Sequence, residues 1–255
     1  MRHNLYFEMY EQEKTYWWHV GKRKIVISLL DRFLGDNGNN QQQIMVDIGC
    51  GTGLMLETMS QYGFAVGMDL SDEALFLCQK RKHRFLIKAD ANLTLPFDDS
   101  SFDLVTALDV LEHINNDGNA VEEFHRVLKE GGILITTVPA FAFLWSYWDK
   151  MLQHKRRYTL NTLVSLFTHN GFLIKKVSYS NFFIFLPVIG LRCVKTLLQR
   201  DKHSTQTSDF IDLPLLLNHI FIQMYRFEAF WLRTFKFPFG LSVVCVGQKR
   251  CYGRP

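Results

Sequence analysis

Residues 46–53 read Val-Asp-Ile-Gly-Cys-Gly-Thr-Gly, with glycine at three alternate positions. Apolar residues at positions 44, 45, 46 and 48 predict a buried parallel strand before the glycines. Residues 54–59 read as a helix after them. Glycines let the backbone turn sharply and let a ligand approach the main chain without meeting a side chain. The order of strand, tight turn and helix is typical of the nucleotide-binding edge of open α/β sheets.

A second predicted strand, residues 65–69, places Asp69 at its carboxyl end. In nucleotide-binding α/β folds, an acid about 20 residues beyond the glycine loop holds ribose hydroxyls. The glycine spacing is GxGxG, and Asp47 stands two residues ahead of the first glycine. Together these features resemble the cofactor site of class I S-adenosylmethionine (SAM)-dependent methyltransferases. A tight turn that binds no ligand is the alternative interpretation.

The resemblance continues from residue 44 to residue 139, and its most specific part after the glycine loop is the acidic turn at 95–103 before an apolar strand at 104–108. It implies a Rossmann-like α/β fold, in which helices flank a seven-stranded sheet with an antiparallel last strand. It also implies SAM as cofactor and S-adenosylhomocysteine as product. The cofactor site implied by the resemblance consists of Trp18, Arg23, Asp47, Gly49, Cys50, Gly51, Gly53, Asp69, Leu70, Asp90, Ala91 and Leu108.

The remaining elements are predicted from periodicity and from capping residues. Ser71 and Thr159 are expected to cap two helices, because hydroxyl side chains accept hydrogen bonds from the first free amides of a helix. The helices are predicted at residues 72–82, 121–128 and 160–167, and the further strands at 85–88, 133–138, 172–178 and 241–248.

Near the N-terminus, a helix is predicted to follow Lys24. The cations at 22–24 would then lie at its N-terminal end, where they oppose the helix dipole. A nearby anion would remove this conflict, either the carboxylate of the cofactor or an acidic group of the substrate. The alternative is a solvated basic turn beside Trp17 and Trp18 in the core. Residues 17–23 resemble a subgroup of SAM methyltransferases in which this helix closes over the cofactor.

The chain is expected to divide into an N-terminal cap with the first helix (1–40), a SAM-binding core (41–180), an apolar helical insertion (181–239), and the last strand with a tail (240–255). The insertion is far longer than a hairpin needs. Cations are interleaved with its apolar residues. It can form a lid over an apolar pocket, a homodimer face, or a peripheral contact with anionic lipid. Each reading favours a hydrophobic or lipid-linked acceptor.

Composition narrows the class of protein. The 255 residues are 47% hydrophobic and carry a formal net charge of +4, which is too mild to indicate a nucleic-acid partner. Five cysteines without a CxxC pair suggest free thiols in a reducing compartment. The polar N-terminus does not resemble a secretory signal, and no apolar run reaches the roughly 18 residues that span a bilayer. We therefore expect a cytoplasmic protein, either free or peripheral at the inner face of the membrane.

Other protein classes share a glycine loop. A nicotinamide-dependent dehydrogenase needs a set such as Tyr-x-x-x-Lys after the cofactor strands, but Tyr10 and Lys14 precede the loop. A metal enzyme needs a compact ligand set, and Glu112, His113 and His125 do not form one in the sequence, so no metal is predicted. A protein that binds SAM without catalysis stays open as an alternative.

Residues 144–158 gather polar and aromatic side chains where a core helix would need apolar periodicity, so they are expected to face the methyl acceptor. His154 is the first candidate for a general base, because the usual pKa of histidine lies near neutrality, and His113 is the second. The predicted acceptor contacts are Asp149, Arg156, Arg157 and Tyr158. Asp149 can orient His154, and the two arginines can clamp a carboxylate or phosphate. The alternative interpretations are that His154 only hydrogen-bonds a backbone carbonyl and that one of the two arginines is a solvated surface charge. The predicted reaction is methyl transfer to an oxygen of a small-molecule or lipid-linked acceptor.

Overall fold

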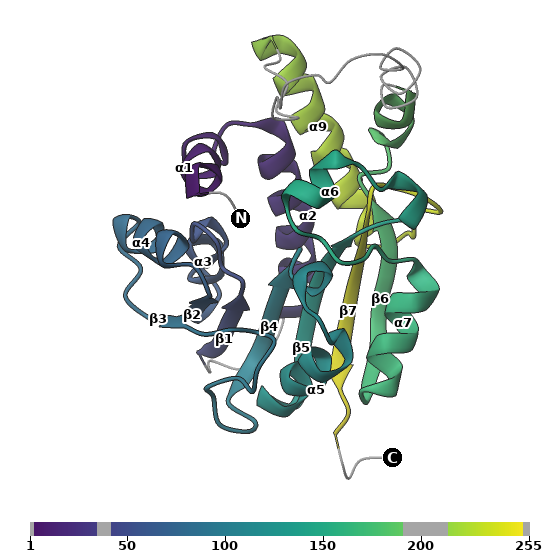
Figure 1. Ribbon diagram of the computed structural model, residues 1–255. Helices are drawn as coiled ribbons and strands as arrows, with labels where there is room; N and C mark the ends of the chain where they lie inside the picture. Colours follow the sequence, from purple (N-terminus) through teal and green to yellow (C-terminus); the bar gives the residue numbers. More distant parts are fainter. Residues whose placement is uncertain (1–2, 35–41, 191–213, 252–255) are drawn as a thin grey trace.

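The computed structural model describes residues 3–34, 42–190 and 214–251, and a seven-stranded sheet forms its centre (Figure 1). The strand order is β3-β2-β1-β4-β5-β7-β6. Neighbours from β3 to β5 are parallel, and β7 runs antiparallel to both β5 and β6. The predicted fold class is therefore confirmed. The strands are β1 Gln43–Ile48, β2 Gly63–Asp69, β3 Leu86–Lys88, β4 Phe102–Leu108, β5 Leu128–Pro139, β6 Phe172–Ser180 and β7 Ser242–Lys249.

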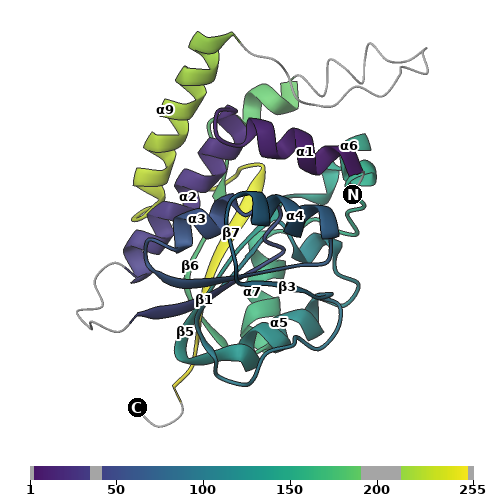
Figure 2. The same cartoon turned by 90° about the vertical axis from the view of Figure 1, so that its left-hand side faces the viewer.

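Helices cover both faces of the sheet (Figure 2). One face carries α2 (Trp17–Leu34), α3 (Leu54–Met59), α4 (Asp72–Lys80) and α9 (Leu215–Leu232). The other face carries α5 (Asp117–Val127) and α7 (Leu160–His169). The remaining elements are α1 (His3–Gln12), α6 (Tyr147–Met151) and the short 3-10 turns η1 (Leu111–His113) and η2 (Ala142–Leu144).

Each face has its own apolar core. Phe124 of α5 and Phe167 of α7 are fully buried on one face, where they pack with strand residues. Leu29 and Leu30 of α2 are fully buried on the other, together with Tyr225 of α9. The two cores keep the sheet rigid, so the loops at the carboxyl ends of the parallel strands are held in fixed places.

The two predicted N-caps are present. The Ser71 hydroxyl accepts a hydrogen bond from the amide of Ala74, and the Thr159 hydroxyl accepts one from the amide of Thr162, each at 3.3 Å. In contrast, α5 begins four residues earlier than predicted, at Asp117, because Asn116 caps it before the apolar periodicity becomes visible.

The predicted start of the first long helix is wrong. α2 begins at Trp17, so the cations at 22–24 lie in its second turn and not at its N-terminal end. The conflict with the helix dipole therefore does not arise. Lys22 instead forms an ion pair with Asp109, which follows β4. The sequence also predicts that this helix ends at Gly35 and that a polar linker follows at 36–43. Gly35 and most of this linker lie outside the described residues.

The predicted insertion lies between β6 and β7, and its described part consists mainly of α9, which packs alongside α2 (Figures 1 and 2). The buried carboxylate of Glu228 accepts hydrogen bonds from the amides of Asn181 and Phe182, and so ties α9 to the end of β6. The sequence also predicts a polar loop at 201–209 within the insertion, and this loop lies outside the described residues. Across the described ranges, no helix combines the length and the apolar character that crossing a bilayer would require.

We predict a pH-dependent stability that arises from Asp47. This carboxylate is buried between β1 and β4 and accepts a hydrogen bond of 2.6 Å from the Thr106 hydroxyl. Burial raises the pKa of Asp47 from 3.8 to about 7. Because the pKa is higher in the folded chain, the unfolded chain releases this proton at a lower pH than the folded chain does. The contribution of Asp47 to the free energy of unfolding is therefore complete below pH 3.8 and is lost as the pH rises through about 7.

Between these limits, Asp47→Asn should flatten the pH dependence of the unfolding free energy by up to about 1.4 kcal/mol per pH unit. Denaturant unfolding measured at several pH values tests this, with Asp98→Asn as the matched surface control. An unchanged slope in Asp47→Asn would contradict the assignment.

Candidate functional site

The glycine loop joins β1 to α3 in a conformation that few other residues adopt. Gly49, Gly51 and Gly53 have φ angles of +71°, +54° and +84°. Side chains at positive φ are strained, which explains the alternation of glycine in the sequence. At Gly49, a Cβ would also lie 2.5 Å from Cγ2 of Val110, so the loop is in close contact with the segment that follows β4. The glycine positions therefore present main chain without side chains next to the ends of β1 and β4, where the amides of Gly49 and Cys50 donate to the carbonyl of Met68.

Asp69 at the end of β2 closes this crevice from the other side. One carboxylate oxygen accepts a hydrogen bond from the amide of Gly51, and the other accepts one from the amide of Ser71, each at 2.9 Å. Burial raises the pKa of Asp69, and the hydrogen bonds from these amides offset only part of the rise. Asp69 is 8% exposed, so its carboxylate is almost fully buried beside the glycine loop. Asp69 thus lies where the sequence predicts a group that can hold ribose hydroxyls.

Helix α1 lies across the glycine loop and the end of β2, a contact that the sequence did not indicate. The methyl group of Met9 lies 3.5 Å from the place where a Cβ of Gly51 would be. Tyr6 lies beside Asp69 and Ser71: burial raises the pKa of its phenol first, and the Asp69 charge raises it further. A ligand on the glycine loop therefore meets Tyr6 and Met9 as part of its surroundings.

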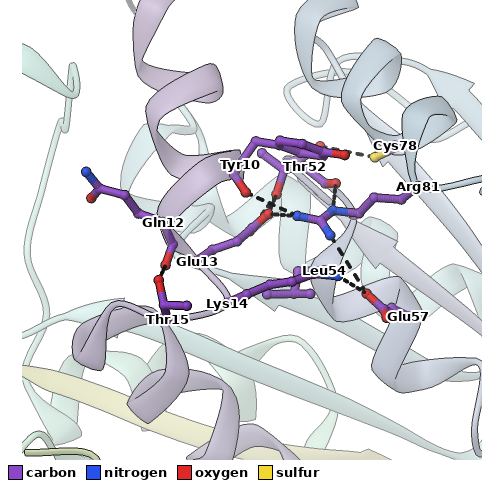
Figure 3. A network of polar contacts seen from close by, with 12 residues as sticks. Tyr10, Gln12, Glu13, Lys14, Thr15, Thr52, Leu54, Glu57, Cys78 and Arg81 are labelled. Atoms are coloured by element: carbon purple, nitrogen blue, oxygen red, sulfur yellow. Dashed lines mark hydrogen bonds and ion pairs between the residues drawn. The ribbon is translucent and has the colours of Figure 1, made fainter. Parts of the chain in front are cut away.

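A buried network holds α1 in this place (Figure 3). Both carboxylate oxygens of Glu13 lie 2.6 Å from the hydroxyl of Thr52 in the glycine loop. Arg81, which follows α4, forms an ion pair with Glu13 and donates a hydrogen bond of 3.0 Å to the carbonyl of Thr52. The guanidinium of Arg81 also lies 4.3 Å from the ring centroid of Tyr10 in α1. The N-terminal helix, the glycine loop and α4 are therefore linked by one set of charged contacts.

The other predicted cofactor residues lie around this crevice or beneath it. Arg23 faces the carboxylates of Glu13 and Glu57, which partly offset the lowering of its pKa by burial. Asp90 accepts two hydrogen bonds of 2.8 Å from Asn92 and so shapes the turn after β3. Trp18 packs on the apolar core beneath α2, and Asp47 and Cys50 are buried. Leu70 is exposed at the end of β2. Ala91, after β3, and Leu108, at the end of β4, are half-buried.

On the acceptor side, His154 is held by a carboxylate. Its Nδ1 lies 2.9 Å from Oδ1 of Asp149, which is fully buried. Arg157 donates to the same carboxylate through Nε and Nη2, at 2.7 and 3.0 Å. Burial opposes the charge on Asp149, but the hydrogen bonds from His154 and Arg157 outweigh it, so the pKa of this carboxyl is lowered. Asp149 therefore stays ionised and orients the imidazole, as the sequence predicts.

Two residues of η1 lie against His154. The rings of His113 and His154 meet edge to face, with centroids 4.8 Å apart. Burial, followed by the neighbouring His154, lowers the pKa of His113 to about 4, so this imidazole is neutral. The fully buried Glu112 approaches His154 Nε2 to 4.0 Å, and burial and then Asp109 raise the pKa of its carboxyl. Glu112 is a site residue that the prediction missed, although its position directly before His113 in η1 was a signal.

The other predicted acceptor residues have partners within the chain. Arg157 also donates to the carbonyl of Ala140 at 2.9 Å, so its guanidinium supports Asp149 and the end of β5. Arg156 pairs with Asp117 at 2.6 Å, and the Tyr158 hydroxyl donates to the same carboxylate at 2.8 Å. These contacts fix the loop that carries His154. His125, in contrast, lies edge to face on Phe172, away from this cluster.

Comparison with known proteins agrees with this geometry. Residues 46–136 match the family model described as a methyltransferase domain. The chain is 31% identical over 121 residues to demethylmenaquinone methyltransferase of Staphylococcus epidermidis, covering 42% of this chain and 50% of that protein. It is 34% identical over 94 residues to ubiquinone biosynthesis O-methyltransferase of Azoarcus sp., covering 34% and 40%. The chain thus spans about half or less of the length of these relatives.

A solved structure shows the same fold over nearly the whole chain. A SAM-dependent methyltransferase from Thermotoga maritima superposes with a TM-score of 0.57 and 21% identity, covering 98% of this chain and 100% of that one. The sheet order and the antiparallel last strand are therefore those of this group of folds.

We predict that Glu13→Gln releases α1 from the glycine loop. The substitution removes the buried ion pair with Arg81, and breaking such a pair costs about 3 kcal/mol. Because no described residue of α1 belongs to the apolar cores, we expect local detachment instead of global unfolding. Amide hydrogen exchange in residues 3–12 should become at least about tenfold faster, whereas the exposed control Glu8→Gln should leave it unchanged. Equal protection in Glu13→Gln and the wild type would argue against the tether.

Proposed function

We propose that this chain, which carries a class I SAM-dependent methyltransferase domain, transfers the methyl group of SAM to an oxygen of a small-molecule or lipid-linked acceptor. The observation that carries the proposal is the positive-φ glycine loop facing the Asp69 carboxylate. A bared main chain with an acid on the neighbouring strand is the arrangement that binds an adenosine-type ligand.

The residues at this edge fit SAM. Each oxygen of Asp69 accepts one amide hydrogen bond, and a carboxylate oxygen can accept more than one, so lone pairs are left for the two ribose hydroxyls. The missing side chain at Gly51 leaves its backbone open toward Met9. Met9 and Tyr6 are side chains of a terminal helix, and they can shift to become one wall of the bound cofactor's site. Arg23 and Trp18 on α2 are the proposed contacts for the methionine part of SAM.

SAM supplies an activated methyl group whose leaving thioether is neutral. The protein therefore needs to align the acceptor oxygen with the methyl carbon, exclude water and accept the hydroxyl proton. His154 fits the last role, because its Nδ1 is engaged by Asp149 and the Nε2 lone pair is left for the acceptor side. The imidazole of His154 has two possible uses. It accepts the hydroxyl proton itself, or it binds another group that activates the hydroxyl. His113 is the second candidate for the same role.

The surface of α9 supports a hydrophobic or lipid-linked acceptor. Leu215, Leu216 and Phe230 are 88%, 72% and 67% exposed, and the exposed Arg226 and Lys236 lie on or just after the same helix. Exposed aromatic and aliphatic side chains beside cations suit an anionic lipid surface. We propose that this face contacts the membrane peripherally while the acceptor is delivered. Docking of a second copy is the alternative use of this face.

The names of the relatives point in the same direction. One is a demethylmenaquinone methyltransferase, and the other is an O-methyltransferase of ubiquinone biosynthesis. We therefore propose phenolic and quinone-like hydroxyls as the first acceptors to test, with and without an apolar tail. A preference for the tailed compounds would support lipid linkage.

We predict that Asp69→Ala weakens SAM binding by about 2 kcal/mol, or roughly 30-fold, because the charge-assisted hydrogen bonds to ribose are lost. Isothermal titration with SAM measures this, and Asp72→Ala, at an exposed acid of α4, is the matched control. A parallel titration with NAD should show no binding. Unchanged SAM affinity in Asp69→Ala, or binding of NAD instead of SAM, would overturn the cofactor assignment.

His154→Ala should lower the rate of S-adenosylhomocysteine formation by about 100-fold and leave SAM affinity nearly unchanged. The exposed His169 of α7 provides the control variant His169→Ala. Normal turnover in His154→Ala would remove this imidazole from the reaction. A wild-type chain that binds SAM but methylates no compound of the panel would favour the non-catalytic alternative.

A further inference from the structure

Three potential metal ligands converge beside the acceptor side of the crevice. Glu112, His113 and His154 each offer one ligand atom, and these atoms all lie within 4.8 Å of one another. Glu112 and His113 belong to η1, just after Val110, whose methyl group contacts the glycine loop. His154 reaches them from the loop after α6. The sequence separates the third ligand from the other two, and only the fold brings them together.

Glu112 gives an independent sign of a missing ligand. Glu112 is fully buried, and neither of its carboxylate oxygens has a hydrogen-bond partner among the described residues. A buried carboxylate without donors is costly unless it is paired or binds a metal ion. Lys22 and Arg157 act on Glu112 through their charge alone, because Lys22 pairs with Asp109 and Arg157 with Asp149. Glu112 is therefore left with charged neighbours but with no hydrogen-bond donor among the described residues.

His154 is oriented as a metal ligand. Asp149 engages Nδ1 of His154, which leaves Nε2 as the ring nitrogen on the side of Glu112. Nε2 lies 4.0 Å from Oε1 of Glu112, which is too far for a hydrogen bond. Metal bonds to nitrogen and oxygen of about 2.0–2.2 Å would span this gap after a small approach of the two side chains. A carboxylate behind a histidine is also the usual outer support of a ligating imidazole.

We propose that Glu112, His113 and His154 hold a divalent first-row transition-metal ion on the acceptor side of the crevice. Two imidazoles and one carboxylate leave positions open on such an ion, and the acceptor's hydroxyl oxygen takes one of them. The inference rests on the proposed function for this last point, whereas the ligand set itself does not depend on it.

The ion would activate the acceptor by lowering the pKa of the bound hydroxyl. The hydroxyl proton passes to solvent, and the oxygen forms a bond to the methyl carbon. The carbon–sulfur bond breaks, and its electron pair stays on sulfur. In this arrangement, His154 contributes its Nε2 lone pair to the metal ion, and it is not itself the base.

The test is direct metal binding by the full chain after removal of metals with a chelator. Titration with Zn²⁺ should show one site. Glu112→Gln and His113→Ala should each weaken it by about tenfold or more, and Asp149→Asn, a positioning variant, by about tenfold. The control variant His169→Ala should bind like the wild type. Equal Zn²⁺ affinity in Glu112→Gln and the wild type, or no binding by the wild type, would overturn the proposal.

A second measurement needs no variant. Cys50 and Cys78 lie with their sulfur atoms 3.8 Å apart and are the competing soft site. The absorption spectrum of the Co²⁺-loaded wild type distinguishes the two sites, because thiolate ligands add an intense charge-transfer band in the near ultraviolet that nitrogen and oxygen ligands lack. Absence of this band with bound Co²⁺ is the expected result, and its presence contradicts the assignment.

SAM titration of the same samples separates the two proposals. Metal binding without SAM binding would refute the proposed function and leave the metal site standing. SAM binding without metal binding would refute the metal site alone.

Discussion

The two hydrogen bonds that Asp69 accepts hold the functional edge of the sheet together. They join the end of β2 to the glycine loop and to the cap of α4, so three separate pieces of backbone share one carboxylate. The glycines at positive φ make this approach sterically permissible, since a side chain at Gly49 or Gly53 would collide with its neighbours. The shape of this edge is therefore defined by main-chain geometry, and the surrounding side chains determine which ligand fits there.

Two sides flank this fixed edge. On one side, α1 rests on the glycine loop and is held by Glu13, Thr52 and Arg81. On the other side, which carries the proposed acceptor residues, the loop after α6 is held by Asp149 and Arg157. Both sides use buried charged groups, which are costly to break and so favour a single arrangement. The rigid sheet and the two charged anchors together place the crevice between them.

The sequence was most informative where the contacts are local. The glycine loop, Asp69 as the end of β2, and the caps Ser71 and Thr159 are all specified by residues a few positions apart, and each is present in the structure. The start of α2 was not predictable in this way. Its first turn has little periodicity of its own and is stabilised by packing of Trp17 on Phe221 of α9, about 200 residues away in the chain.

The candidate site shows the same division. Pairing of His154 with Asp149 could be predicted, because the two residues lie five positions apart. The approach of Glu112 to His154 could not, since it depends on how the loop after α6 folds back over η1. Likewise, no pattern within residues 1–24 indicates that Glu13 meets Thr52, because the two residues are 39 positions apart and belong to separate elements.

Asn218 connects the far end of α9 to the elbow between α1 and α2. Its side chain accepts a hydrogen bond from the amide of Trp17 and donates one to the carbonyl of Thr15, each at 2.9 Å. The start of α9 therefore cannot shift relative to the elbow between α1 and α2 without breaking both hydrogen bonds.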